Sequence, residues 1–208
     1  MSNMDGKVCL ITGAGSGIGR SAAQIIGSRG GVVIVHDISR DGAEETAAMG
    51  RDAGGTADVR LADVSDVAAM RKLVAEAEAA HGRIDVLVNN AGTVNDFCPI
   101  DEVTEEMFER SMNVHVRGSL FTTQAVVAGM KERRSGKIIN MSSIQGTVGN
   151  PNGATYNAAK GALLAMTKGW AKEFGPFNIN VNAVAPGPTI TPMSVNKLAP
   201  EYFEERKK

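Results

Sequence analysis

Short runs of β-branched and apolar residues alternate along this chain with longer segments of helical periodicity. Six runs are predicted as strands: Val8–Ile11, Val32–His36, Ala57–Leu61, Ile84–Val88, Ile138–Met141 and Ile179–Val184. Five segments are predicted as helices: Gly17–Arg29, Asp41–Met49, Asp66–Ala80, Glu105–Lys131 and Thr155–Phe174. Several strands are almost wholly apolar, which suits a parallel sheet covered on both faces. The alternation predicts an α/β fold of the doubly wound, Rossmann type, as a single domain over residues 1–208.

Charge and cysteine content exclude several classes of function. The formal net charge is −1, which gives no electrostatic reason to expect a nucleic-acid partner. No apolar run approaches membrane-spanning length, so no membrane association is expected. Cys9 and Cys98 lack a disulfide or metal-binding spacing, and His36, His81 and His115 lie far apart, so no metal site is expected. Reduced thiols without a signal peptide predict a cytoplasmic protein.

A glycine-rich turn follows the first predicted strand and opens the first predicted helix. It reads Thr12-Gly13-Ala14-Gly15-Ser16-Gly17-Ile18-Gly19. Glycines there allow positive φ and close approach of the backbone to a pyrophosphate, and the helix N-terminus offers free N–H groups. The spacing differs from the more usual G-x-G-x-x-G, and such a turn alone is weak evidence. In this setting it predicts a dinucleotide phosphate site.

Asp37 ends the second predicted strand, twenty residues after Gly17. A carboxylate at this place can accept hydrogen bonds from the adenosine ribose hydroxyls, and it would repel a 2′-phosphate. Ser16 and Ile38 supply no cation to hold that phosphate, although Arg40 is close in sequence. NAD is therefore the expected cofactor, with NADP less favoured. The alternative role for Asp37 is a turn or helix-capping carboxylate.

Other polar groups also follow predicted strands. Asp63 comes after the third strand and is suited to accept a hydrogen bond from the adenine amino group, with Val64 against the ring. The fourth strand closes with Asn89-Asn90-Ala91-Gly92. Ligands of open α/β sheets bind at the carboxyl ends of strands, so these residues are expected to share one site.

Tyr156 and Lys160 are spaced i, i+4 near the start of the last predicted helix, so they share one face. A free tyrosine has a pKa of about 10, and a neighbouring ammonium favours the phenolate. A tyrosine and a lysine at this spacing usually lie on an exposed helix surface and have no catalytic role. Here Ser142-Ser143 follows the fifth strand at the same edge, and Asn113 lies within the long helix expected to flank it. Together these residues predict general acid/base chemistry.

With these residues assembled, the chain resembles the classical short-chain dehydrogenase/reductase family in its NAD-preferring form. Thirteen residues separate Ser143 from Tyr156, as in that family, which favours Ser143 over Ser142. The resemblance covers essentially the whole chain, through Thr12–Gly19, Asp37, Asp63-Val64, Asn89–Gly92, Asn113, Ser143, Tyr156, Lys160, Pro186-Gly187 and Thr191. It implies an NAD(H)-dependent oxidoreductase that interconverts a secondary alcohol and a ketone by hydride transfer.

The resemblance also implies a role for each residue. Tyr156 exchanges a proton with the substrate oxygen, which Ser143 orients. Lys160 lowers the Tyr156 pKa and binds the nicotinamide ribose, and Asn113 holds a water that links Lys160 to solvent. The substrate set is Ser143, Gln145 and Tyr156. The cofactor set is Gly13, Gly15, Ser16, Gly17, Ile18, Gly19, Asp37, Ile38, Asp63, Val64, Asn90, Ala91, Gly92, Tyr156, Lys160, Pro186, Gly187, Thr189 and Thr191.

The sequence departs from the family at its C-terminal end. Family members usually continue through another helix and a seventh strand, whereas this sequence ends at Lys208, within what resembles the start of a substrate lid at residues 186–208. The chain is therefore expected to be C-terminally incomplete, without the last strand and helix of the family. The resemblance also implies a homo-oligomer, a dimer or tetramer, in which Glu105–Lys131 and Thr155–Phe174 form the dimer interface.

The substrate is the least defined part of this interpretation. Gln145, Asn150 and Asn152 favour a polar small molecule such as a polyol or hydroxy acid. One alternative is a 3-oxoacyl-(acyl-carrier-protein)-type reductase that docks an acidic carrier through Arg133, Arg134 and Lys172; Asp37 argues mildly against it, because biosynthetic reductases tend to favour NADPH. Another is a truncated, non-catalytic NAD-binding protein, against which the intact catalytic set argues.

Overall fold

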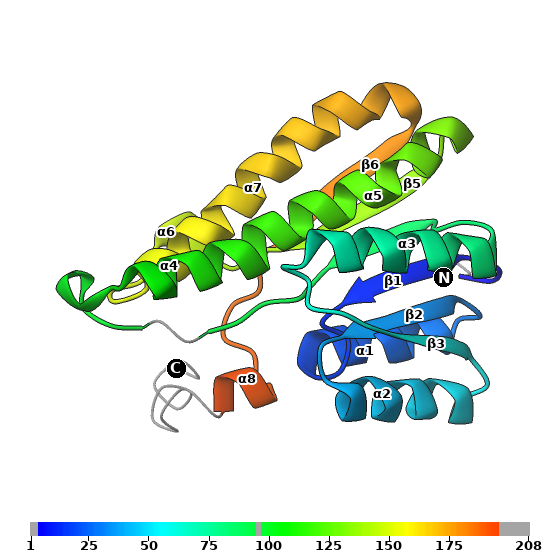
Figure 1. Ribbon diagram of the computed structural model, residues 1–208, viewed down its shortest axis with the longest axis horizontal. Helices are drawn as coiled ribbons and strands as arrows, with labels where there is room; N and C mark the ends of the chain where they lie inside the picture. Colours follow the sequence, from blue (N-terminus) through cyan, green and yellow to red (C-terminus); the bar gives the residue numbers. More distant parts are fainter. Residues whose placement is uncertain (1–3, 95–96, 196–208) are drawn as a thin grey trace.

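The computed structural model describes residues 4–94 and 97–195. Its six strands form one parallel sheet in the order β3-β2-β1-β4-β5-β6 (Figure 1). Their bounds are β1 Val8–Thr12, β2 Val32–Asp37, β3 Thr56–Leu61, β4 Val86–Asn89, β5 Gly136–Met141 and β6 Ile179–Val184. This order is that of a Rossmann sheet and confirms the predicted fold class. The part of the chain that the structure describes contains no seventh strand.

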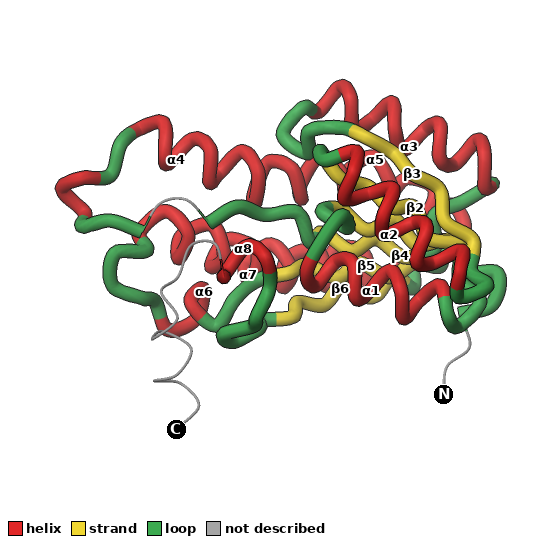
Figure 2. Tube along the Cα trace, turned by 90° about the horizontal axis from the view of Figure 1, so that it is seen from below, coloured by secondary structure: helices red, strands yellow, loops and turns green. Residues whose placement is uncertain are grey.

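Helices cover the sheet on both faces (Figures 1 and 2). Asp66 caps α3 by accepting hydrogen bonds from the N–H groups of Ala68 and Ala69, and Gly82 ends that helix in a left-handed conformation. The helices are α1 Gly17–Gly27, α2 Arg40–Asp52, α3 Val67–His81, α4 Glu105–Met112, α5 Gly118–Arg133, α6 Gln145–Val148, α7 Ala154–Phe174 and α8 Pro192–Val195, with short 3₁₀ turns η1 Ile100–Glu102 and η3 Gly175–Phe177. Within the described residues, no helix is both long enough and apolar enough to cross a bilayer.

The two faces of the sheet bury alternate residues of β1, as the twofold periodicity of a strand requires. Val8 and Leu10 pack into a core with α3, α5 and α7, whereas Cys9 and Ile11 pack into a second core with α1 and α2. Because both faces are filled, β1 is buried along its whole length. The central strands are thereby fixed, and their carboxyl ends form a common edge.

The predicted helix Glu105–Lys131 is wrong as a single α-helix. The structure breaks it into α4, a π turn η2 at Asn113–Arg117, and α5. In this turn the N–H of Gly118 donates to the carbonyl of Asn113, five residues back, which widens the helix by one residue. The turn faces His115 inward, where its side chain is 1% exposed.

A buried polar chain ties the centre of the sheet to the helices. Asn89 Nδ2 donates to Asn140 Oδ1 at 2.9 Å and to Thr123 Oγ1 at 3.0 Å. Asn140 Nδ2 in turn donates to Thr167 Oγ1 at 2.8 Å. These bonds link β4, β5, α5 and α7 beneath the carboxyl edge of the sheet.

Removing the middle of this chain is expected to destabilise the fold. Asn140→Ala takes away an acceptor and a donor from buried partners, and we expect the free energy of unfolding to fall by about 1–3 kcal/mol. The control is Asn180→Ala on β6, where the side chain is exposed, with an expected change within about 0.5 kcal/mol. Urea denaturation followed by circular dichroism measures both. Equal stability of the two variants would contradict the buried network.

Candidate active site

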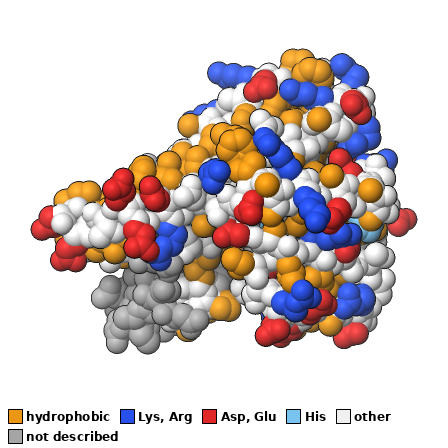
Figure 3. All heavy atoms as spheres, in the orientation of Figure 1, with side chains coloured by type: hydrophobic (Ala, Val, Ile, Leu, Met, Phe, Trp, Pro, Cys, Tyr) orange, Lys and Arg blue, Asp and Glu red, His pale blue; other side chains and the backbone are white. Residues whose placement is uncertain are grey.

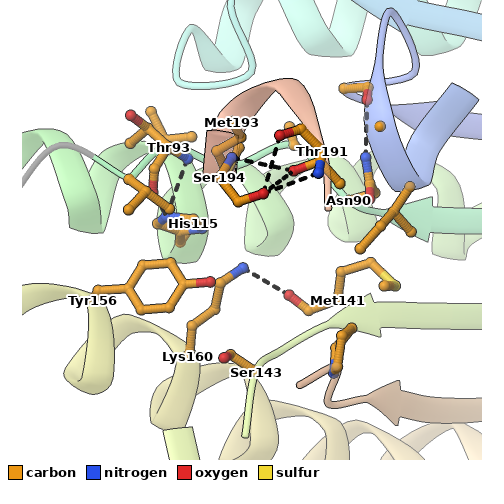
Figure 4. A pocket seen from close by; sticks show the side chains of 18 of the residues that line it. Asn90, Thr93, His115, Met141, Ser143, Tyr156, Lys160, Thr191, Met193 and Ser194 are labelled. Atoms are coloured by element: carbon orange, nitrogen blue, oxygen red, sulfur yellow. Dashed lines mark hydrogen bonds between the residues drawn. The ribbon is translucent and has the colours of Figure 1, made fainter. Parts of the chain in front are cut away.

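A cavity of about 820 Å³ opens at the carboxyl edge of the sheet. Its wall contains residues that follow each of the six strands, which is the position where open α/β sheets bind ligands. Figure 4 shows part of this wall, with Tyr156 and Lys160 from α7 on one side, and His115, Thr191 and Ser194 on the other. A cavity of this size suits a cofactor together with a small substrate.

Most of the predicted site residues line this cavity. From the cofactor and substrate sets these are Gly13, Ser16, Gly17, Ile18, Asp37, Ile38, Asp63, Val64, Asn90, Ala91, Gly92, Ser143, Gln145, Tyr156, Lys160, Pro186, Gly187, Thr189 and Thr191. Gly15, Gly19 and Asn113 are not part of the lining. Gly15 and Gly19 instead belong to the tightly packed glycine turn before α1. The predicted lid at 186–208 lies only in part within the described residues, since 196–208 fall outside them.

The glycine turn before α1 forms a tight backbone cradle. Gly13 and Gly17 have φ values of +64° and +55°, which side chains rarely adopt. A Cβ on Gly13 would lie 2.7 Å from Ala91 Cα, and one on Gly19 would collide with the carbonyl oxygen of Gly13. The Ser16 side chain makes no capping hydrogen bond, so the first N–H groups of α1 face the cavity without a side-chain acceptor. This cradle fits a diphosphate at a helix N-terminus.

Asp37 sits beside that cradle at the end of β2. Its Oδ2 accepts a hydrogen bond from the Gly15 N–H at 2.7 Å, and its Oδ1 accepts from the Ser39 N–H at 2.9 Å. The two bonds hold the carboxylate at the cavity wall. Among the described lining residues, the only lysine and arginine are Lys160 and Arg110, which come from α7 and α4 rather than from the neighbourhood of Asp37.

The proton-handling residues stand on α7 and at the end of β5. Lys160 Nζ lies 5.4 Å from the centre of the Tyr156 ring and donates to the carbonyl of Met141 at 2.8 Å. Burial lowers the pKa of Lys160 from 10.5 to about 7. Ser142 Oγ donates to the carbonyl of Lys160 at 2.7 Å and so anchors α7 to β5. Ser143 Oγ instead accepts from the N–H of Gln145 at 3.2 Å, at the cavity wall.

The structure also brings in His115, which the sequence had not indicated as a site residue. His115 lines the cavity and packs edge-on against the Tyr156 ring, with centroids 5.5 Å apart, and Phe97 lies 6.1 Å from the same ring. Met193 and Ser194 of α8 contribute from the other side (Figure 4). The histidine had been considered only as a metal ligand, although a lone histidine in a helix next to the predicted Asn113 was a usable signal.

The site therefore combines a dinucleotide cradle with a tyrosine–lysine pair and a serine at one cavity, an arrangement suited to proton exchange beside a bound cofactor. Known proteins are similar to this chain over most of its length. A model of the short chain dehydrogenase family matches residues 7–201. A 3-oxoacyl-[acyl-carrier-protein] reductase of Thermotoga maritima is 41% identical over 191 residues, which cover 92% of this chain and 77% of that protein. A cyclopentanol dehydrogenase of Comamonas sp. is 35% identical over 198 residues, which cover 93% and 77% of the two chains.

Solved structures agree. The crystal structure of an NAD⁺-bound xylitol dehydrogenase matches with a TM-score of 0.88 at 33% identity, and the match covers 99% of this chain and 76% of the other. The likeness thus extends over nearly all of this chain, both in sequence and in structure. This chain belongs to the short-chain dehydrogenase family and is an oxidoreductase that works with a nicotinamide cofactor.

Proposed function

We propose that this enzyme interconverts a secondary alcohol and a ketone with NAD(H) as the cofactor. The observation that carries the proposal is a single cavity that joins the Asp37 carboxylate and glycine cradle to Ser143, Tyr156 and Lys160. The relative named cyclopentanol dehydrogenase and the NAD⁺-bound xylitol dehydrogenase support this class of substrate. A nicotinamide dinucleotide, when bound, supplies or accepts the hydride.

The chain's own residues handle the substrate oxygen and its proton. In the reductive direction Tyr156 Oη donates its proton to the carbonyl oxygen, and Ser143 Oγ donates a hydrogen bond to the same oxygen. The ammonium of Lys160 stabilises the phenolate that remains on Tyr156. In the oxidative direction the phenolate takes the hydroxyl proton. Asn113, the fourth residue of the predicted catalytic set, stands apart from this group because it does not line the cavity.

The cofactor residues divide along the cavity. The glycine cradle and the N-terminus of α1 would hold the diphosphate, Asp37 the adenosine ribose, and Asp63 with Val64 the adenine. The segment from Pro186 to Thr191 would line the nicotinamide. Its closeness to the cradle supports this, because a Cβ on Gly17 would lie 3.3 Å from Thr191 Cβ. We further propose that this segment begins the substrate lid.

Preference for NAD over NADP rests on Asp37 and can be tested there. Asp37→Ser removes a charged acceptor, so we expect NADH to bind about 10- to 100-fold more weakly, the range for a hydrogen bond to a charged group. NADPH should lose less or gain, because the repulsion of its 2′-phosphate is relieved. Asp41→Asn, an exposed change on α2, is the control. Nicotinamide fluorescence measures both affinities, and an unchanged NADH/NADPH ratio would contradict the assignment.

Turnover tests the function as a whole. The purified chain is given NADH with a panel of cyclic and acyclic ketones, and oxidation of NADH is followed by absorbance. Turnover with ketones and tight NADH binding support the proposal. NADH binding without turnover on any ketone or thioester would support the non-catalytic alternative.

A second candidate is a 3-oxoacyl-(acyl-carrier-protein)-type reductase. The 41% identical relative of that name supports it. The two candidates differ in their preferred substrate and cofactor, so a 3-oxoacyl thioester with NADPH belongs in the same panel. A preference for that combination over simple ketones with NADH would favour the reductase.

We propose a homo-oligomer, a dimer or tetramer, that places α4, α5 and α7 at the interface. Hydrophobic side chains gather along the slope over these helices in Figure 3. Phe108 on α4 and Leu120 on α5 are 48% and 36% exposed. Such apolar exposure on one side suits a face that a second subunit covers.

We also propose that the protein is cytoplasmic. Both cysteines are free, which supports this proposal.

A further inference from the structure

His115 occupies an unusual place for a histidine. It stands in the π turn between α4 and α5, is 1% exposed, and lies at the cavity wall opposite Lys160 and next to Tyr156 (Figure 4). Its ring meets the Tyr156 ring nearly at right angles, with an interplanar angle of 84°. A polar ring so fully buried needs partners for both of its nitrogens.

Only one ring nitrogen has a partner within the described residues. His115 Nε2 lies 2.9 Å from the carbonyl oxygen of Thr93. The Thr93 N–H also lies 3.3 Å from Nε2, but the contact with the carbonyl oxygen is the shorter of the two. A carbonyl oxygen can only accept, so we assign the ring proton to Nε2. Nδ1 then carries a lone pair, and it is buried without a hydrogen-bond partner.

That lone pair borders the same space as the Lys160 ammonium. A Cβ added to Gly92 would lie 3.2 Å from His115 Nδ1 and 3.7 Å from Lys160 Nζ, so both nitrogens flank the side-chain-free face of this glycine. An ammonium has three N–H donors, and the carbonyl of Met141 accepts one of them. Within residues 4–94 and 97–195 this is the one hydrogen bond of Lys160 Nζ, which leaves two donors for other acceptors, and His115 Nδ1 borders the same face of Gly92.

The charges around His115 keep it neutral. The titratable side chains beside it are Lys160 and Tyr156, both from α7, whereas the loop after β4 offers the backbone of Gly92 and Thr93. Arg110 of α4 lines the same cavity. Burial, and then the charge of Lys160, lower the pKa of His115 to about 3. The imidazole is therefore a neutral acceptor throughout the working pH range.

We propose that His115 is a positioning residue for Lys160, whose ammonium donates to His115 Nδ1 directly or through one water molecule and is thereby held, charged, beside Tyr156. This inference rests on the proposed function and adds His115, which lines the cavity, to the residues beside Lys160. It goes beyond the predicted catalytic set of Asn113, Ser143, Tyr156 and Lys160, which does not contain His115.

The test compares His115→Phe, which keeps an aromatic edge against Tyr156 but has no Nδ1, with His115→Asn, which restores an acceptor. We expect His115→Phe to lower kcat by about 10- to 100-fold, the range for a hydrogen bond to a charged group, with KM for the ketone and Kd for NADH within about threefold. The loss of activity at alkaline pH should begin at a lower pH than in the wild type. His115→Asn should recover most of kcat.

The matched control is Thr122→Val on α5, which removes a buried hydroxyl that has no hydrogen-bond partner among the described residues and does not line the cavity. It should keep the wild-type kcat and pH profile. Wild-type kcat and pH profile in His115→Phe would overturn the inference. So would equal losses of kcat in the Phe and Asn variants, together with an equal fall in Tm, because that pattern reports packing alone.

A readout without turnover separates this inference from the proposed function. In protein labelled with ¹³C at lysine Cε, the Lys160 resonance, assigned by its loss in Lys160→Met, titrates at the pKa of the ammonium. His115→Phe should lower that pKa by about one unit, which corresponds to the lower end of the kcat loss. An unchanged pKa overturns the inference even if the wild type turns over no ketone. If the wild type turns over no ketone but His115→Phe still lowers the Lys160 pKa, this inference stands and the proposed function is rejected.

Discussion

Tyr156→Phe is expected to lose about 10²- to 10⁴-fold of kcat, the range for removal of a general acid/base. The change deletes one oxygen and keeps the ring that packs against His115 and Phe97, so the cavity wall and the fold should persist. Without the hydroxyl, no group at that place can give a proton to the substrate oxygen. NADH affinity, measured by fluorescence titration, should stay within about threefold of the wild type.

Two outcomes for Tyr156→Phe would contradict the proposed mechanism. If the variant turns over at the wild-type rate, the proton comes from another group. If NADH binding is lost together with turnover, and Tm falls as well, the tyrosine acts through structure. Ser143→Ala, measured alongside, should reduce kcat less, since it removes a hydrogen bond and leaves the proton source.

Lys160→Met is expected to separate activity from stability. Turnover should fall by about 10²-fold or more, because the phenolate of Tyr156 loses its nearby cation. Stability should rise instead. The pKa of Lys160 falls from 10.5 to about 7 through burial, so the folded protein carries a charge that the unfolded chain solvates better. Methionine fills similar space without that charge.

The pH dependence follows from the same shift. Below about pH 7 Lys160 is charged in both states, and the full cost of burying it is present. Between about 7 and 10.5 the unfolded state holds the proton that the folded state has released, so wild-type stability rises with pH. The Tm advantage of Lys160→Met should be roughly 2–8 °C below pH 7, on a scale of about 2–4 °C per kcal/mol. It should shrink towards high pH.

An exposed lysine on the same helix provides the control. Lys168→Met, also on α7, should keep turnover and change Tm by less than about 2 °C at any pH. Calorimetric scans across the pH range measure all three proteins. A Lys160→Met variant that is less stable than the wild type at low pH would show that the Met141 carbonyl and other acceptors outweigh the burial of the charge.

The strand pattern and the strand-end residues could be predicted from the sequence, because both depend on local rules. Apolar runs bounded by turn residues placed all six strands within two residues at each end. β4 starts two residues later than predicted, at Val86. Asp85 lies before the strand, where its Oδ2 accepts a hydrogen bond from the N–H of Val8. Parallel strands share a carboxyl edge, and this brought Asp37 and Ser143 to one cavity.

The residues that α4, the π turn and α5 place near Lys160 could not be predicted in the same way. Residues 105–131 have the periodicity of one helix, and nothing in their propensities indicates a turn that closes over five residues. The π turn depends on packing between α4, α5 and α7, which a local pattern does not contain. The family resemblance selected Asn113 within this segment, whereas the folded chain presents His115 at the cavity.

The wide turn at Asn113–Arg117 also fixes the angular phase between two helices. Each residue of an α-helix advances the next by about 100° around the axis, so the extra residue of a π turn rotates everything on one side of it by that amount. The Arg110 side chain of α4, which lines the cavity, would point elsewhere in a chain that lacked one residue of this turn. In comparisons of this enzyme with its relatives, a one-residue gap at this turn therefore changes the inward-facing set more than most substitutions do.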